Sequence, residues 1–503
     1  MTEMKWEALR GEDLLWLMIN SITSKNFIWF IICVGMNNFR FTKIVASVSP
    51  ILAKETVLSK IINMVDAFTL TLSRGFDDNN KKYIDTLMKL DNSKTVILET
   101  KGNEVRIKNI GNFAIKVWQK VVVEYSEYTQ ENESKIYIDY PNMDLITVWS
   151  EIKFVQSWVV LKVEKNIDDA VECTVIEAKE KHIFQYDRCL LEHNEDPIET
   201  LLERDEKDIL WGLEYWVHII SISACYSAEH IQATKDFLKD KNNGEMKVFA
   251  KIETRKWLDN LQEIVEVADW VILVADFITP LLYKEETIED LVQYIRGKWV
   301  PVLVNYANRP SQYEYALNQE NQLQHRCEQC VDGVYLEPMI IEDEVFDAIE
   351  KIETTLEKYE LKYQPKNPVR FDEKDFEIRD YIIFNAYRIT QELDVRAIVC
   401  FTENGYTAAR IASLNPAVPI ITFTKSSHTY RFLNVVRWLK GYKISQSFNY
   451  ENLKRIWKEM IRIIFKWNIS LDDKVLIVQS HELNDDVKSD MINGIELYQF
   501  KNI

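Results

Sequence analysis

The sequence predicts an α/β protein that is built on a (β/α)8 TIM barrel, with an inserted all-β domain and a C-terminal α/β domain. Two observations carry this prediction. Eight short apolar segments of strand length alternate with segments of helical periodicity, as parallel strands with crossover helices require. One long gap, between the third and the fourth apolar segment, instead contains alternating apolar and polar residues, which indicates an all-β insertion.

The β-α-β pattern is clearest around Lys247–Glu253 and Trp270–Asp276, which are apolar and short enough for buried strands. Between them, Trp257–Val267 has apolar residues at helical spacing, which predicts one helix. The other expected barrel strands are Lys43–Ser49, Ala67–Ser73, Thr95–Lys101, His218–Ala224, Trp299–Asn305 and Asp332–Glu337. Lys251 and Glu253 end a strand at the edge where barrel enzymes place their catalytic groups.

These patterns divide the chain into five parts. The expected parts are residues 1–40 (an N-terminal arm), 41–102 (the first part of the barrel), 103–200 (the inserted β domain), 201–362 (the second part of the barrel) and 363–503 (the C-terminal α/β domain). Tyr363–Val369 contains two prolines and is expected to be a linker. Strands of the C-terminal domain are expected at Ala397–Phe401, Ile420–Thr424 and Lys474–Gln479.

Composition excludes several classes of partner. A net charge of −18 argues against nucleic acid and anionic membranes. The apolar segment Asn26–Val34 is too short to span a bilayer and is expected to be a helix or strand that packs on the barrel. The seven scattered cysteines predict reduced thiols and a cytoplasmic protein. Cys327 and Cys330 form a lone CxxC pair, which we expect in a surface loop because a structural zinc site needs a second pair.

Glycine is scarce, with 12 residues in 503, whereas ordinary usage is about 7%. Glycine allows the backbone to approach a phosphate closely and supplies positive φ in tight loops. The scarcity therefore indicates that loops which contact a substrate have been altered.

Five segments resemble motifs of the pyruvate kinase family, in the order of that family. They are FTKIVASVSP (41–50), LETKGNEVR (98–106), IYIDYPNM (136–143), AKIET (250–254) and IVCFTENGYTAARIASLNPAVPIITFT (398–424). The resemblance implies phosphoryl transfer from phosphoenolpyruvate to ADP with Mg²⁺ and K⁺, and an inserted domain that acts as a mobile lid. It also implies a homo-oligomer, or a mixed oligomer with a paralogue.

By this resemblance, Lys251 is the catalytic lysine that contacts the transferring phosphoryl group, and Glu253 is the first metal-binding carboxylate. The second metal-binding position falls on Phe277, so Asp276 lies one residue early and, on a strand, would point to the other face unless a bulge intervenes. A partial potassium-type site is implied at Ser73, Glu99 and Thr100, and substrate contacts are implied at Lys101 and Arg106. The alternative is that Lys251 and Glu253 only form ion pairs with their neighbours.

Several positions depart from the family pattern. A phosphate-binding arginine is replaced by Thr69, a potassium-binding asparagine by Thr71, the metal-binding aspartate by Phe277, a proton-delivering threonine by Tyr306 and a lid aspartate by Val155. Loss of one charge-stabilising group commonly costs a factor of about 10²–10³ in rate. The combination predicts impaired catalysis.

The C-terminal domain contains a polar loop that opens a helix and resembles the effector region of the family. Its candidate residues are Thr402, Asn404, Gly405 and Thr407, with Lys425 and Arg431 close in sequence. A helix N-terminus of this kind can bind an anion such as a sugar bisphosphate. Ordinary strand-to-helix turn chemistry explains the same residues equally well.

Three hypotheses remain open. The first is a catalytically impaired pyruvate kinase-like protein with a binding or regulatory role linked to glycolysis. The second is an active but divergent pyruvate kinase, in which Asp276 and Arg74 serve as substitutes. The third is a structural protein without ligands.

Overall fold

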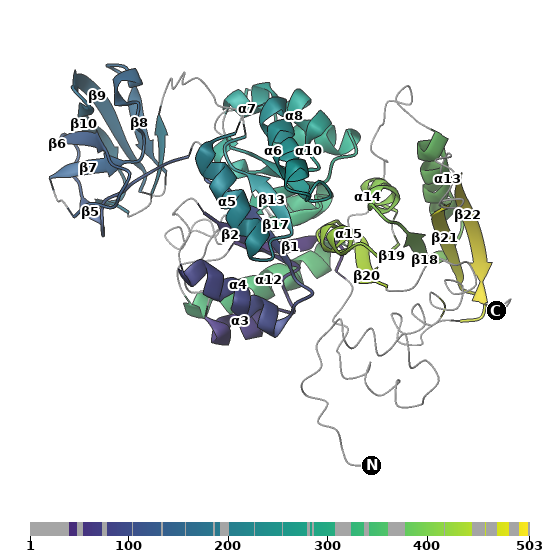
Figure 1. Ribbon diagram of the computed structural model, residues 1–503. Coiled ribbons are helices and arrows are strands. Elements are labelled where there is room, and N and C mark those ends of the chain that lie inside the picture. The colour runs from purple at the N-terminus through teal and green to yellow at the C-terminus, as the bar shows by residue number, and fades with distance from the viewer. Residues whose placement is uncertain are drawn as a thin grey trace, which may run out of the picture. The chain divides into compact units, whose positions relative to one another are not determined.

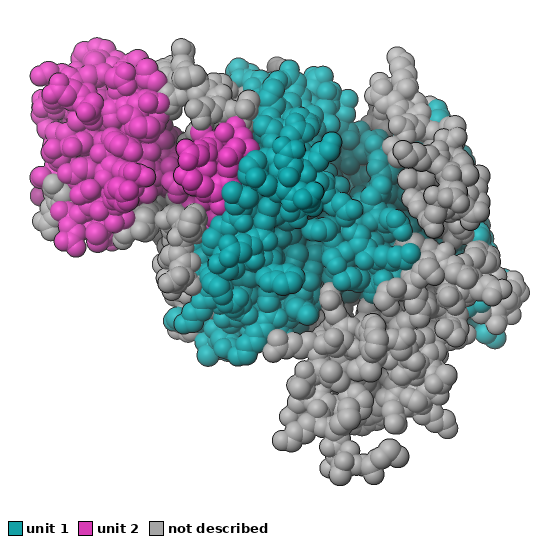
Figure 2. Space-filling model, in the orientation of Figure 1, with its two compact units in different colours: residues 1–71, 76–99, 209–503 teal, residues 72–75, 100–208 magenta. Residues whose placement is uncertain are grey.

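The computed structural model describes residues 40–47, 54–72, 78–102, 104–131, 134–155, 157–184, 187–191, 201–225, 227–253, 255–278, 282–283, 286–306, 323–336, 342–360, 378–416, 418–444, 458, 470–481 and 492–500. Two compact units are coloured separately in Figure 2. Unit 1 comprises residues 1–71, 76–99 and 209–503, and unit 2 comprises residues 72–75 and 100–208. Residues 1–39, the segment Asn26–Val34 and the expected linker Tyr363–Val369 lie outside the described residues.

Unit 1 contains a closed barrel of eight parallel strands (Figure 1). In barrel order they are β1 (Lys43–Ser47), β17 (Gly333–Leu336), β16 (Val302–Tyr306), β15 (Trp270–Leu273), β14 (Lys247–Ile252), β13 (Ile219–Ile222), β3 (Thr95–Glu99) and β2 (Ala67–Thr71). Each lies within, or within one residue of, an apolar segment that predicted it, which confirms the fold class. The connecting helices are α3 (Glu55–Ile61), α4 (Asp78–Leu90), α5 (Glu203–Glu214), α6 (Ala228–Asp240), α7 (Arg255–Asp259), α8 (Leu261–Val267), α9 (Ala275–Ile278), α10 (Ile288–Gly297) and α12 (Glu342–Glu360).

Two expected elements differ in detail. The single helix expected at Trp257–Val267 is wrong, because Asn260 separates α7 from α8. Asparagine competes with the helical backbone for hydrogen bonds and therefore favours helix ends. The strand expected at Trp270–Asp276 is also wrong in its last residues, since β15 ends at Leu273 and the apolar run continues into helix α9.

A repeated hydrogen bond fixes the register at the amino ends of the barrel strands. At four places, the side chain just before one strand accepts an N–H group of the neighbouring strand that precedes it in the chain, from the first or second residue of that strand. The pairs are Asp66 with Ile44 N (2.9 Å), Asp269 with Val248 N (3.0 Å), Asp332 with Val302 N (2.9 Å) and His218 Nδ1 with Val96 N (2.9 Å). Burial and the nearby Arg431 and His428 hold the pKa of His218 well below its usual value, so the ring is neutral and accepts this bond.

Unit 2 is an antiparallel-rich β domain, which the alternating pattern predicted. Its seven-stranded sheet follows the order β4 (Val105–Arg106), β12 (Arg188–Leu191), β8 (Glu151–Phe154), β9 (Val159–Ile167), β10 (Ala170–Ala178), β6 (Lys120–Tyr125) and β7 (Lys135–Ile138). A second sheet pairs β11 (His182–Ile183) with β5 (Phe113–Ala114), and the short helix η2 spans Met143–Leu145. The inward-facing residues of the strands form one apolar core that includes Val123, Ile136, Leu161 and Val171, all fully buried.

The C-terminal part of unit 1 is a five-stranded sheet with helices beside it. The sheet order is β20 (Leu439–Lys443), β19 (Ile420–Thr424), β18 (Val395–Phe401), β21 (Lys474–His481) and β22 (Ile492–Gln499), of which only β22 is antiparallel to its neighbour. The helices are α13 (Ile378–Glu392), α14 (Tyr406–Ser413) and α15 (Ser427–Leu433). The three strands predicted here are present, and β20 and β22 are additional.

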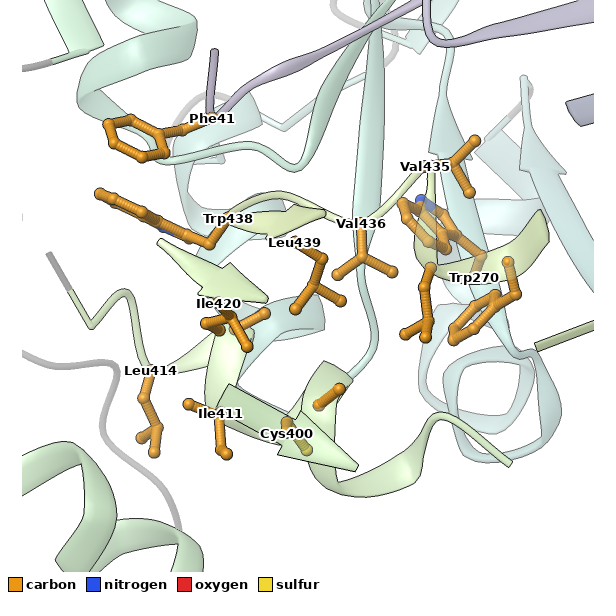
Figure 3. Packing of buried hydrophobic residues seen from close by; sticks show 14 of the residues in the cluster. Phe41, Trp270, Cys400, Ile411, Leu414, Ile420, Val435, Val436, Trp438 and Leu439 are labelled. Atoms are coloured by element: carbon orange, nitrogen blue, oxygen red, sulfur yellow. The ribbon is translucent and has the colours of Figure 1, made fainter. Parts of the chain in front are cut away.

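This C-terminal sheet and the amino end of the barrel share one apolar cluster (Figure 3). Phe41 faces Trp438, with ring centroids 4.0 Å apart, and Phe432 meets the edge of Trp270 at 5.7 Å. Arg296 is 2% exposed and donates to the carbonyls of Cys330 and Ser413 and to Asn415 Oδ1. Because full burial of a large apolar side chain contributes about 1.5–3 kcal/mol, this cluster fixes the two parts to each other.

No helix in the described part of the chain is long and apolar enough to cross a membrane.

Candidate active site

A layer of polar side chains lies inside the barrel at the carboxyl halves of its strands. The interior apolar residues of the barrel belong to one buried cluster, which includes Val45, Ile97, Ile219 and Leu303. Side-chain direction alternates along a strand, so the residue two positions later faces the same way. The polar residues at these next interior positions are Ser47, Thr69, Glu99, Ser221, Lys251 and Asn305, and all of them are buried.

Lys251 is the central residue of this layer. Its Nζ lies 3.3 Å from Oε1 of Glu253, which directly follows the same strand, and 3.5 Å from Glu99 Oε2, on β3. The three side chains are 8%, 0% and 2% exposed, respectively. The ammonium also lies 5.6 Å from the centroid of the Tyr335 ring. The structure therefore brings together Lys251, Glu253 and Glu99, which the sequence singled out separately.

Together with Glu253, this layer holds two carboxylates beside one ammonium, which gives it a net negative charge. In the described carboxyl halves of the barrel strands, Lys251 is the one cationic side chain, and it stands between two carboxylates. At an effective dielectric constant of about 20, each of these pairs is worth about 5 kcal/mol of Coulomb attraction. The ammonium is thus already neutralised by the protein before any phosphate arrives.

Three hydroxyl groups of the layer, on Ser47, Thr69 and Ser221, have no hydrogen-bond partner among the described residues. A buried hydroxyl without a partner is unfavourable, so each of them is available to a polar ligand. Thr69 stands where the resemblance places a phosphate-binding arginine. Ser47, Ser221, Asn305 and Tyr335 were missed by the sequence analysis, although the two-residue period of each strand would have placed them beside the apolar interior positions.

Other predicted site residues are described only in part. Asp276 and Phe277 lie in the first turn of α9 rather than on a strand, so the argument from strand alternation is wrong for Asp276. Tyr306 is the last residue of β16, and Thr71 is the last residue of β2. The side chains of Asp276, Phe277 and Tyr306, and the whole of Ser73, lie outside the described residues.

The described residues do not fit a resident Mg²⁺ ion. Among them, no group of three or more His, Cys, Asp or Glu side chains could hold a metal. Glu253, the expected first ligand, has the Lys251 ammonium 3.3 Å away, and this charge repels a divalent cation. For K⁺, the Thr100 hydroxyl is buried without a hydrogen bond among the described residues and is a suitable oxygen ligand, but one oxygen does not make a site.

In unit 2, the two expected substrate-binding cations are bonded to carboxylates of their own unit. Lys101 Nζ lies 2.9 Å from Asp139 Oδ2, and burial lowers the pKa of Lys101 while Asp139 raises it. Arg106 Nε donates to Glu104 at 2.9 Å. Val155, the degenerate lid position, is half-buried in the loop after β8, and its N–H group bonds to the Arg188 carbonyl at 2.9 Å.

The sequence analysis also missed two buried carboxylates where the chain leaves the inserted domain. Asp205 Oδ1 accepts the N–H group of Gly102 at 3.0 Å, and Asp208 accepts a backbone hydrogen bond from Lys101. Burial raises the pKa of Asp205 to about 6, and burial together with the charge of Asp205 raises the pKa of Asp208 to about 7. The two side chains therefore link the segment in which the chain leaves the inserted unit to Lys101 and Gly102, where the chain enters it.

The candidate effector loop is closed by its own side chains. Thr402 Oγ1 accepts the N–H group of Gly405, and Asn404 Oδ1 accepts the N–H group of Tyr406, both at 3.0 Å. Gly405 adopts a φ of +83°, and Thr407 is buried in the first turn of α14. Two amides that an anion would use are therefore already bonded within the loop.

Arg431 is close to this loop in sequence, but its guanidinium donates to the carbonyls of Lys94 and Asn92, just before β3. Cys327 and Cys330 do not lie in a surface loop, because residues 323–328 are helical and both cysteines are buried. The apolar residues Leu323 and Val331 draw this segment against the barrel.

The closed barrel, the β domain inserted after its third strand and the C-terminal parallel sheet define a class of TIM-barrel proteins with two accessory domains. The model of the pyruvate kinase barrel domain matches residues 39–276, and the model of the pyruvate kinase alpha/beta domain matches residues 380–493. The chain belongs to the pyruvate kinase family.

Curated relatives agree with this assignment. A pyruvate kinase of Staphylococcus aureus (strain MRSA252) is 25% identical over 418 residues, covering 79% of this chain and 70% of the relative. A pyruvate kinase of Staphylococcus haemolyticus (strain JCSC1435) is 26% identical over 424 residues, with the same shares. At this level of identity the family is clear, whereas the state of each site residue depends on the structure.

Proposed function

We propose that this member of the pyruvate kinase family is catalytically impaired and acts as a binding or regulatory protein linked to glycolysis, as a homo-oligomer or in a mixed oligomer with an active paralogue. The observation that supports this proposal most is the neutralised Lys251. Its ammonium lies within 3.5 Å of both Glu99 and Glu253, inside a layer that offers no second cation among the described strand residues. Phosphoryl transfer depends on positive charge around the transferred group, and this layer has a net negative charge.

Replacement of the arginine at Thr69 supports the same conclusion. A buried threonine hydroxyl cannot supply the bidentate, positively charged contact that arginine makes with phosphate. The unbonded hydroxyls of Ser47, Thr69 and Ser221 instead favour a neutral polar ligand inside the barrel.

The alternative is an active, divergent pyruvate kinase that uses phosphoenolpyruvate, ADP, Mg²⁺ and K⁺. The backbone position of Asp276 favours it, because α9 follows β15 directly at the carboxyl edge of the barrel. A carboxylate there is on the correct side of the barrel for a metal.

The deciding experiment measures pyruvate formation by the purified protein from phosphoenolpyruvate and ADP, with Mg²⁺ and K⁺ present. The proposal expects a rate equal to that of the same mixture without the protein. A rate well above this background would overturn it and establish the alternative.

A matched control uses Lys247→Met, because Lys247 begins the same strand and pairs with Asp269 at 3.2 Å, at the opposite end of the barrel. If the protein is active, Lys247→Met retains turnover while Lys251→Met loses it. Thermal shifts with phosphoenolpyruvate, with ADP and with glucose as a neutral polyol then report which class of ligand binds.

A further inference from the structure

Tryptophan occupies backbone positions that ordinarily belong to glycine. Nine tryptophans lie among the described residues, and six of them have a positive φ. They are Trp118 (68°), Trp149 (74°), Trp158 (51°), Trp216 (63°), Trp299 (64°) and Trp438 (67°). Only three glycines of the described chain have a positive φ, namely Gly102, Gly111 and Gly405.

This distribution is opposite to the usual one. Positive φ brings Cβ too close to the following carbonyl oxygen, so glycine, and less often asparagine or aspartate, is found there. A bulky residue in this region is an outlier. Of the five other non-glycine positions with positive φ in the described chain, Asp168, Asn242 and Asn415 follow the rule, whereas Ala224 and Cys330 do not. Tryptophan is therefore the residue that needs an explanation.

Two of these six tryptophans directly follow a helix, at the position where glycine commonly terminates a helix. After α10, Trp299 N donates to Arg296 O at 2.9 Å and Val300 N donates to Ile295 O at 3.3 Å. After α5, Val217 N donates to Gly212 O at 3.1 Å, around Trp216. These bonds form the Schellman motif, whose left-handed residue is usually glycine.

Two others occupy the third position of a tight turn in unit 2. Gln119 N donates to Lys116 O at 3.0 Å and closes a turn around Trp118. Ser150 N donates to Thr147 O at 3.2 Å and closes a turn around Trp149. A positive φ at the third residue alone defines a type II turn, which requires glycine or asparagine there.

Burial does not compensate the strain at three of these four sites, whereas Trp299 is half-buried beside the apolar cluster, with the Arg410 guanidinium 4.5 Å from its ring centroid. Trp118, Trp149 and Trp216 are 76%, 69% and 74% exposed, and in the described chain their indoles fill no core. Trp158 ends the hairpin loop between β8 and β9 and is 37% exposed. Trp438 differs, since it is buried and donates to Asn415 Oδ1 at 3.1 Å.

We propose that the protein, as its own cell makes it, carries glycine at Trp118, Trp149, Trp158, Trp216, Trp299 and Trp438. One cause accounts for all six: the gene has the codon UGA at these positions, and the cell decodes it as glycine. UGA is a stop codon in the standard code, and it is reassigned to tryptophan in some genetic codes and to glycine in others. The same cause explains why the sequence has 14 tryptophans and only 12 glycines. This inference is independent of the proposed function.

The direct test sequences tryptic peptides of the protein from its source cells by mass spectrometry, together with the codons of the gene. Glycine is expected in the peptides that cover Trp216 and Trp299, with UGA in the gene. Tryptophan in these peptides would overturn the inference, and the exposed indoles of unit 2 would then be candidates for a binding surface.

A second test uses recombinant protein and thermal unfolding. The quadruple variant Trp118→Gly/Trp149→Gly/Trp216→Gly/Trp299→Gly is expected to raise the melting temperature, because glycine relieves the strain at positive φ. The matched control is Trp211→Gly/Trp257→Gly, whose tryptophans lie within helices α5 and α7 without positive φ, and it is expected to lower the melting temperature. A quadruple variant that melts below the parent protein contradicts the inference.

Discussion

Replacement of Lys251 by methionine is expected to destabilise the barrel strongly. Methionine keeps most of the side-chain volume but removes the charge between Glu99 and Glu253. Each pair contributes about 5 kcal/mol of Coulomb attraction at an effective dielectric constant of about 20. Part of this attraction offsets the cost of burying the ammonium. Breaking a buried ion pair by removing one partner therefore costs about 3–5 kcal/mol net, because charges remain buried without compensation.

The assay is urea-induced unfolding followed by far-UV circular dichroism, with the free energy of unfolding obtained by linear extrapolation. The control is Lys81→Met, since Lys81 and Asp85 form an exposed i,i+4 pair at 2.7 Å that is worth about 0.3–0.5 kcal/mol. Adding Glu253→Gln to Lys251→Met should recover part of the lost stability, because it removes one of the two buried carboxylates that have lost their counter-charge. A loss below about 1 kcal/mol for Lys251→Met would refute the reasoning.

Two further outcomes are expected. Asp208→Asn should stabilise the protein more at pH 8 than at pH 5. The pKa of Asp208 is raised to about 7, so between about pH 4 and pH 7 the folded parent protein binds more protons than the unfolded chain. The free energy of unfolding of the parent protein therefore falls as the pH rises through this window, by up to about 4 kcal/mol. Thermal unfolding across this pH range measures the effect, and parallel pH profiles of parent and variant would count against it. Arg296→Met should cost about 3 kcal/mol, because it removes three buried hydrogen bonds of about 1 kcal/mol each, whereas the exposed Arg388→Met should be nearly neutral. Urea unfolding of both variants measures this difference, and equal effects would contradict it.

The fold was predictable because it depends on local patterns. Buried parallel strands read as continuous apolar runs, and all eight runs became strands. Because these runs are continuously apolar, the exact ends of the strands cannot be predicted from hydrophobicity. The run that begins at Trp270 stays apolar through Ala275, yet the chain turns into α9 after Leu273, and hydrophobicity alone does not mark that change.

The site was predictable only where a residue matched a motif. Lys251, Glu253 and Glu99 were found in this way, but the ion pair between Lys251 and Glu99 joins segments 152 residues apart and is invisible in the sequence. Asp205 was missed for the same reason, since its partner is Gly102. Arg431 is close in sequence to the effector loop, but this closeness says nothing about the direction of its side chain, which bonds to the segment before β3.

The apolar cluster at the amino end of the barrel has a consequence for dissecting the protein. Trp270 is covered by Phe432, which comes from the last quarter of the chain. A fragment truncated before residue 378 would expose the Trp270 ring to water and lose the hydrogen-bond acceptors of Arg296 at Ser413 and Asn415. The barrel and the C-terminal sheet therefore behave as one folding unit, and expression vectors, domain swaps and fusion partners should keep both together.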